Sequence, residues 1–274
     1  MLKKWRRKLR GQHNQHRLRE RDILQQLSPY YPNSAFTFDY PNFTYTCAKN
    51  FPDQLESLIK RSQLAARLPQ VRPVDQIGLA DELATLLDHY GSDKNALHNY
   101  TPLYTSVLRP LRDRMDVALL EVGLGTNHPK LISTMGPEGK PGASIRAFAD
   151  YLPDARIFGA DIDSKILFQT DRIRTAPVDQ LKLDTFTEMT DALGCNQFDI
   201  IIDDGLHSPE ANLNTLMFGL SALKAHGCII IEDIPRRALS VWSTVSAILG
   251  GDDIRCEVVE AASQSHLFVV EKLS

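Results

Sequence analysis

The sequence lacks the features that mark membrane-spanning, secreted and disulfide-stabilised proteins. Its apolar runs are short, as at Cys228–Ile231, whereas a bilayer-spanning helix needs roughly 20 apolar residues. The basic residues near Met1 are not followed by an apolar stretch, so we expect no secretory signal. The four cysteines, at 47, 195, 228 and 256, form no CxxC or other close pair, which favours reduced thiols over a disulfide framework or a zinc site. These absences predict a cytoplasmic protein without a transmembrane segment.

Charge is nearly balanced overall but unevenly distributed. The chain has a net charge of −3, yet residues 1–21 contain nine Lys or Arg against Glu20 alone, which leaves the remaining residues at −11. A basic segment of this kind favours contact with an anionic surface, although a solvated helix explains it equally well. The acidic remainder argues against a nucleic-acid-binding protein, because a phosphate backbone requires a cationic surface to dock on.

Two regions of different pattern divide the chain. Residues 1–78 are expected to form an N-terminal extension, with helical spacing over 1–27 and 53–68 and an aromatic, proline-rich segment between them. Residues 79–274 are expected to form the main domain. At 274 residues and 43% hydrophobic content, the chain can build both.

The main domain alternates short apolar runs with amphipathic stretches. Near-continuous apolar runs lie at 117–122, 156–161, 198–203 and 228–233, and runs of this kind are typical of parallel strands buried on both faces. Segments 254–261 and 265–272 are too close for a crossover helix, so they must form an antiparallel hairpin. The pattern predicts an α/β, doubly wound, mostly parallel sheet with a terminal hairpin. This topology resembles the seven-stranded, Rossmann-like sheet of class I methyltransferases more than that of dehydrogenases.

The first two strands end in residues suited to a nucleoside. The first ends in the motif ExGxG, from Glu121 to Gly125, but the third glycine of a dinucleotide fingerprint is replaced by His128. S-adenosylmethionine has no phosphate and fits this pattern better, although such glycines can serve a turn alone. The second strand ends in Asp161, which can accept hydrogen bonds from ribose hydroxyls; Asp163 is an alternative as a helix N-cap. Asp161 lies 38 residues after Gly123 instead of about 20, which a loop insertion over 126–141 explains.

Acidic residues follow two further strands. One strand ends in Asp203-Asp204-Gly-Leu-His207, and another ends in Glu232-Asp233. Adjacent parallel strands bring such residues to one sheet edge, where the carboxylates would repel one another unless a cation lay between them. Oxygen ligands favour a hard ion such as Mg²⁺.

Together these motifs resemble the Mg²⁺-dependent sugar O-methyltransferases that act on macrolide and related glycosides. The resemblance covers about residues 85–235 and includes GSDK at 91–94 with His98 and Tyr100, Gly142 to Arg146, and the sequence VDQ at 178–180. It implies that Asp204, Glu232 and Asp233 bind the metal and that His207 is the general base. It further implies that Asp161 binds ribose and that Asp179 and Gln180 lie near adenine.

We therefore expect an enzyme that methylates a hydroxyl of a sugar or glycoside, on a natural product or a surface glycan. The expected cofactor-binding residues are Glu121, Gly123, Gly125, Asp161, Ile162, Asp179, Gln180 and Asp203. Two alternatives stay open: a methyltransferase with another acceptor such as nucleic acid, and an NAD-dependent oxidoreductase. The missing glycine and the terminal hairpin disfavour the oxidoreductase. The sequence leaves oligomeric state open.

Overall fold

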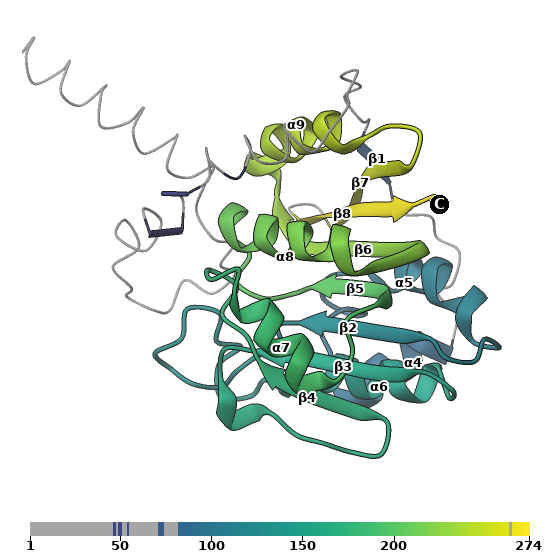
Figure 1. The fold of residues 1–274 in the computed structure, drawn as a ribbon. Helices are drawn as coiled ribbons and strands as arrows, with labels where there is room; N and C mark the ends of the chain where they lie inside the picture. The colour runs from purple at the N-terminus through teal and green to yellow at the C-terminus, as the bar shows by residue number, and fades with distance from the viewer. Residues whose placement is uncertain (1–45, 48, 51–53, 55–70, 74–81, 263–264) are drawn as a thin grey trace, which may run out of the picture.

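One mixed sheet runs through the described part of the chain (Figure 1). The computed structural model describes residues 46–47, 49–50, 54, 71–73, 82–262 and 265–274. Within these residues the sheet has eight strands in the order β1-β7-β8-β6-β5-β2-β3-β4. The strands are β1 (Val71–Pro73), β2 (Ala118–Val122), β3 (Arg156–Asp161), β4 (Ile173–Pro177), β5 (Phe198–Asp203), β6 (Leu223–Pro235), β7 (Ile254–Ala262) and β8 (Ser265–Lys272).

The sheet confirms the fold class predicted from the sequence. Without β1 it has the seven-strand order of class I methyltransferases, and β8 is the strand that runs antiparallel to its neighbours β6 and β7. The predicted terminal hairpin is β7–β8. Two strands were not predicted. β4 has no continuous apolar run because it is an edge strand with exposed positions such as Arg174, and β1 adds to the sheet beyond β7 from within residues 1–78.

Helices cover both faces of the sheet. They are α4 (Glu82–Tyr90), α5 (Thr101–Leu108), α6 (Ala143–Tyr151), α7 (Thr185–Leu193), α8 (Pro209–Ala222) and α9 (Leu239–Leu249). Because side chains alternate along a strand, Leu120 of β2 belongs to the core cluster that includes residues of α7, α8 and α9, whereas Leu119 belongs to the cluster that includes residues of α4, α5 and α6. This double cover explains why the central strands are apolar on both faces. In the described residues, no helix is long and apolar enough to span a bilayer.

Only parts of the expected N-terminal extension lie within the described residues. The predicted helix over 1–27 and most of the predicted helix over 53–68 lie outside them. Where it is described, the segment contacts α8: Asn50 Nδ2 donates to Glu210 Oε1 at 2.7 Å, and Gln54 Nε2 donates to Asn214 Oδ1 at 2.8 Å. Cys47 is fully buried. The N-terminal segment thus packs beside the helix that follows His207.

Candidate active site

The tip of β2 lies against the loop that follows β5. Gly123 has φ +95°, and a Cβ atom on it would stand 2.1 Å from the Asp204 carbonyl oxygen. Glycine meets both demands, since it tolerates positive φ and has no side chain to clash. The backbone contact is fixed by a hydrogen bond from Asp204 N to Val122 O at 2.8 Å. The first strand tip therefore sets the position of Asp204.

The loop from β5 to α8 turns His207 back toward the sheet edge. His207 has φ +53°, a conformation that is uncommon for residues other than glycine. Directly after it, the Ser208 side chain accepts a hydrogen bond from Ala211 N and caps α8, whose first residue is Pro209. The early start of α8 thus limits the loop to the few residues that carry Asp204 and His207.

A bulge in β6 presents two consecutive carboxylates on the same side of the sheet. The pairing of β6 with β8 shifts between Ile231 and Ile234, and Asp233 has φ +55°. In a regular strand, neighbouring side chains point to opposite faces, and a bulge removes that alternation. Consequently, Glu232 and Asp233 both receive hydrogen bonds from tyrosines at the start of α5, Tyr104 and Tyr100.

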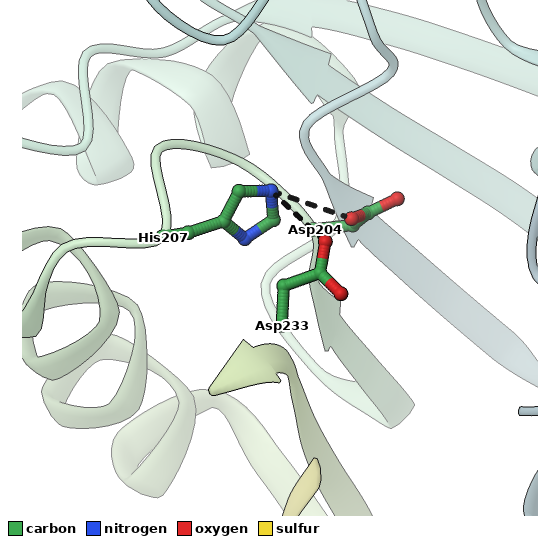
Figure 2. A group of neighbouring side chains, drawn as sticks. All are labelled: Asp204, His207 and Asp233. Carbon is green, nitrogen blue, oxygen red and sulfur yellow. Dashed lines mark ion pairs between the residues drawn. The ribbon is translucent and has the colours of Figure 1, made fainter. Parts of the chain in front are cut away.

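Asp204, His207 and Asp233 form an open group at this edge (Figure 2). His207 Nε2 lies 3.8 Å from Asp204 Oδ1 and 3.6 Å from Asp233 Oδ2. One ligand atom from each residue falls within 4.8 Å of the other two, a spacing at which they could share a metal ion. The structure thus brings together two of the three predicted metal ligands, Asp204 and Asp233, and the predicted general base, His207.

Lys94 lies among three carboxylates, those of Glu121, Asp204 and Glu232. Together with Asp233 these residues are called the acidic cluster. Lys94 precedes α5, and its side chain is 1% exposed. Its ammonium lies 2.6 Å from Asp204 Oδ2, 2.7 and 2.8 Å from the two Glu232 oxygens, and 3.2 Å from Glu121 Oε1. Burial opposes the charge on Lys94, but the three carboxylates raise its pKa well above the ordinary value. Burial in turn raises the pKa of Glu121 to about 7.

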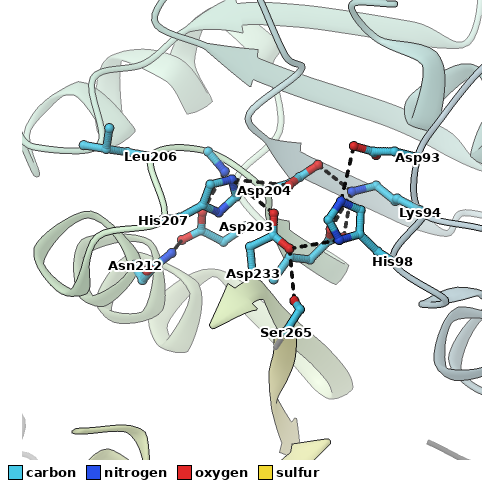
Figure 3. A network of polar contacts seen from close by, with 12 residues as sticks. Asp93, Lys94, His98, Asp203, Asp204, Leu206, His207, Asn212, Asp233 and Ser265 are labelled. Atoms are coloured by element: carbon cyan, nitrogen blue, oxygen red, sulfur yellow. Dashed lines mark hydrogen bonds and ion pairs between the residues drawn. The ribbon is translucent and has the colours of Figure 1, made fainter. Parts of the chain in front are cut away.

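Polar groups from the segment around the start of α5 and from β8 contact one carboxylate oxygen of Asp233, Oδ1 (Figure 3). Asp233 Oδ1 accepts hydrogen bonds from Tyr100 and Ser265, and His98 Nδ1 lies 3.5 Å away. His98 Nε2 faces Asp93 at 3.4 Å; burial opposes the charge on His98, but these carboxylates raise its pKa. These contacts occupy Oδ1 and leave Oδ2 directed toward His207.

A pocket of about 250 Å³ lies beside this cluster, at the carboxyl ends of β2, β3 and β4. Asp161 on its wall is held by two backbone amides: Oδ2 accepts from Leu124 N and Oδ1 from Asp163 N, each at 2.8 Å. Exposed Ile162 and part of the loop after β2 face the same space. The lining comprises Val122, Gly123, Lys130, Leu131, Ile132, Ser133, Asp161, Ile162, Val178, Asp179, Gln180, Leu181, Gly205 and Leu206.

Curated proteins with similar sequences include O-methyltransferases of a rhamnosyl tetracenomycin and of mycinamicin VI. The chain is 30% identical over 176 residues to 8-demethyl-8-alpha-L-rhamnosyl tetracenomycin-C 2'-O-methyltransferase of Streptomyces olivaceus, a match that covers 64% of this chain and 43% of that protein. It is 31% identical over 156 residues to mycinamicin VI 2''-O-methyltransferase of Micromonospora griseorubida, covering 56% of this chain and 36% of that protein. Over these residues the chain is similar in sequence to sugar O-methyltransferases. It spans less than half the length of these relatives.

Solved methyltransferase structures share the fold of this chain. The MycE methyltransferase of the mycinamycin biosynthetic pathway, in complex with Mg and SAH, aligns with a TM-score of 0.53 at 24% identity, covering 69% of this chain and 54% of that one. The MycE complex with Mg, SAH and mycinamycin VI aligns with a TM-score of 0.55 at 21% identity, covering 90% of this chain and 66% of that one. No protein-family profile matches the chain.

The structure separates the predicted cofactor-binding residues of this chain into two groups. Gly123, Asp161, Ile162, Asp179 and Gln180 line the pocket, whereas Glu121, Gly125 and Asp203 do not. Glu121 contacts Lys94 and accepts a hydrogen bond from Ser144. The Met135 side chain occupies the space where a Cβ atom on Gly125 would stand. Asp203 is fully buried and accepts hydrogen bonds from Gln180 and Asn212, so it braces the pocket wall from behind.

Several residues of the site carried no assigned role in the sequence analysis. Tyr100 and Tyr104 stand four residues apart, a spacing that places side chains on one helix face, and this pattern could have indicated a paired function. Lys94 lies within GSDK, and a lysine in a motif shared with metal-dependent enzymes could have raised the same question. Asp163 caps the 3₁₀ helix Ser164–Ile166 by accepting from Lys165 N, which confirms the N-cap alternative for that residue.

Proposed function

We propose that this protein is an S-adenosylmethionine-dependent O-methyltransferase that transfers a methyl group to a hydroxyl of a sugar or glycoside with the help of Mg²⁺. The observation that carries the proposal is the convergence of Asp204, His207 and Asp233 next to the pocket at the strand tips. General-base catalysis of methyl transfer needs the base and the cofactor in one crevice, and His207 directly follows Leu206, which lines the pocket that we assign to the cofactor.

The pocket fits an adenosyl cofactor. Asp161 is buried and fixed by two amides, and each of its oxygens retains a lone pair for a ribose hydroxyl. Ile162 offers an exposed apolar surface for the adenine ring. Gln180 is held by hydrogen bonds to Asp203 and to Leu206 N. S-adenosylmethionine would supply an electrophilic methyl group on sulfur, and Gly123 lets the β2 tip approach it without a side chain.

The acidic cluster fits a hard divalent cation. Asp204 Oδ1 and Asp233 Oδ2 face the same space, and carboxylate oxygens are the ligands that Mg²⁺ prefers. We assign the cation to Asp204 and Asp233; Glu232, the third ligand that the family resemblance implies, has both of its oxygens on the Lys94 ammonium. A bound Mg²⁺ would lower the pKa of an acceptor hydroxyl. His207 would then accept the hydroxyl proton at Nε2, with Asp204 and Asp233 stabilising the imidazolium.

The acceptor is proposed from the relatives. Those proteins act on rhamnosyl tetracenomycin C and mycinamicin VI, so we assign this chain a glycosylated small molecule, with a surface glycan as the next candidate. The expected place of action is the cytoplasm. An anionic contact of residues 1–21 stays a prediction, since they lie outside the described residues.

The test is calorimetric titration of the full chain with S-adenosylmethionine and with NAD⁺, each with and without Mg²⁺. We expect micromolar binding of S-adenosylmethionine and none of NAD⁺. A panel of rhamnosylated and macrolide glycosides, with a short RNA for comparison, is then incubated with S-adenosylmethionine and Mg²⁺, and products are read by mass spectrometry. Absence of S-adenosylmethionine binding in both conditions would reject the proposal, and methylation of the RNA alone would reassign the acceptor.

A further inference from the structure

Lys94 is the cation at the centre of the acidic cluster. The side chains of Lys94, Glu121 and Glu232 are at most 2% exposed, and Asp204 is half-buried. Within the described residues, the ammonium of Lys94 is the positive group in direct contact with these three carboxylates. Buried carboxylates in such proximity repel one another, and an unpaired one carries a large desolvation cost.

The contacts of Lys94 overlap with those that a metal ion would make. The structure offers two groups of possible metal ligands: Asp204 with His207 and Asp233, and Asp204 with Glu121 and Glu232. The second group surrounds the Lys94 ammonium, which lies within 3.2 Å of an oxygen of each member. Asp204 belongs to both groups, with Oδ2 on Lys94 and Oδ1 facing His207.

We propose that Lys94 is a positioning residue that serves as the resident counter-cation of the acidic cluster. Its ammonium holds Asp204 and Glu232 in their active arrangement before a divalent cation binds, and it competes with that cation for their oxygens. Lys94 thereby confines the divalent cation to the half of the cluster that His207 faces. This inference rests on the proposed metal dependence and adds the residue that controls it.

The arrangement around Lys94 supports a fixed ammonium. Tyr104 donates to Glu232 and Tyr100 donates to Asp233, so neighbouring oxygens are already oriented by hydroxyl groups from the same helix end. Ser144 orients Glu121 in the same way. Two of the three carboxylates that Lys94 contacts, Glu121 and Glu232, therefore cannot turn away without breaking a second hydrogen bond.

The experiment compares Lys94→Met with wild type, using Mn²⁺ as the probe cation and the full chain stripped with EDTA. We expect Lys94→Met to have a lower melting temperature without cation and to regain most of the loss with Mg²⁺. Its Kd for Mn²⁺, read by electron paramagnetic resonance, should be at least about tenfold lower than that of wild type, since a neighbouring unit charge shifts an ionic equilibrium at a carboxylate by that much. Lys94→Arg should restore wild-type Mn²⁺ affinity.

The matched control is Lys224→Met. Lys224 Nζ also lies 2.6 Å from a buried carboxylate, Asp199, but this pair lies at the opposite edge of the sheet, where β5 and β6 begin. We expect Lys224→Met to lose stability without any rescue by Mg²⁺ and without a change in Mn²⁺ affinity. A merely structural role for Lys94 predicts the same result for both variants.

The outcomes separate the two proposals. If wild type binds Mn²⁺ and Lys94→Met binds it no more tightly, the role of Lys94 is rejected and the metal site stands. If wild type binds no Mn²⁺ but Lys94→Met does, the role of Lys94 stands and the proposed metal dependence fails. Should Lys94→Met not fold, the double variant Lys94→Met/Glu232→Gln restores the charge balance and is expected to fold without cation; its failure to fold as well overturns the inference.

Discussion

Gly123 lies so close to Asp204 that a Cβ atom on it would stand 2.1 Å from the Asp204 carbonyl oxygen. One side of this contact lines the pocket that we assign to the cofactor, and the other side continues into the acidic cluster. The proposed cofactor pocket and the proposed metal ligand Asp204 are therefore linked through two strand tips, β2 and β5, with no intervening side chain.

Gly123→Ala should weaken both sites at once. The added methyl group must push the Asp204 backbone away, and φ +95° is unfavourable for alanine, so we expect a loss of more than about 1 kcal/mol in the free energy of unfolding. Affinity for S-adenosylmethionine, measured by calorimetry, should fall at least about tenfold, the equivalent of 1.4 kcal/mol. Gly136→Ala is the matched control, since Gly136 has φ +79° but no atom within 4 Å of its Cβ position. Equal cofactor affinity in the two variants would contradict the steric link.

The sequence predicted the parts of the site that depend on strand order alone. Apolar runs located β2, β3, β5 and β6, and the residues directly after those runs had to meet at the carboxyl edge of the sheet. Asp161, Asp204, His207 and Asp233 were placed correctly at this edge for that reason.

The parts that depend on packing between distant segments were not predictable in this way. Lys94 and Tyr104 reach the cluster because α5 packs on the sheet at that edge, and no local pattern specifies that angle. The bulge that turns Glu232 and Asp233 to one side could not be predicted either, since the sequence IIIED is typical of a regular strand. For the same reason the sequence did not reveal that Glu121, a predicted cofactor-binding residue, contacts Lys94.

The loop after β2 should contribute to cofactor affinity. Residues 130–133 line the pocket, and the loop is held by hydrogen bonds from Met135 N to Thr126 O at 2.8 Å and from Asn127 Nδ2 to Gly136 O at 2.6 Å. Ile132→Asp exchanges an apolar wall for a charge, so we expect the Kd for S-adenosylmethionine to rise about tenfold or more, in line with the burial of one aliphatic side chain. Met115→Asp, at a 71% exposed position, should leave the Kd unchanged. An unaltered Kd for Ile132→Asp would show that the cofactor does not reach this wall.

His266 should make the fold less stable in mild acid. Burial lowers the pKa of His266 below its ordinary 6.5, so the folded state keeps this side chain neutral at pH values where the unfolded chain binds a proton. Its contribution to stability is therefore complete above pH 6.5 and is lost as pH falls through the folded-state pKa. Urea unfolding at about pH 7.5 and 5.5 should show a smaller decrease in stability for His266→Gln than for wild type. The exposed residue His226 provides the control, because His226→Gln should retain the wild-type decrease.

His207 should be required for turnover but not for cofactor binding. It lies outside the residues that line the cofactor pocket, and its Nε2 faces Asp204 and Asp233. Removing a general base typically costs 10² to 10⁴ in rate, so His207→Ala should lower kcat by about that factor on an accepted glycoside while calorimetry shows an S-adenosylmethionine Kd close to wild type. His226→Ala is a matched control, because His226 also has a positive φ, +61°, and alanine, which keeps the Cβ atom, leaves similar backbone strain at both positions. Should both variants retain wild-type kcat, His207 is not the base, and the proton must leave by way of another group at the edge of the cluster, of which His98, 3.5 Å from Asp233 Oδ1, is the next to test.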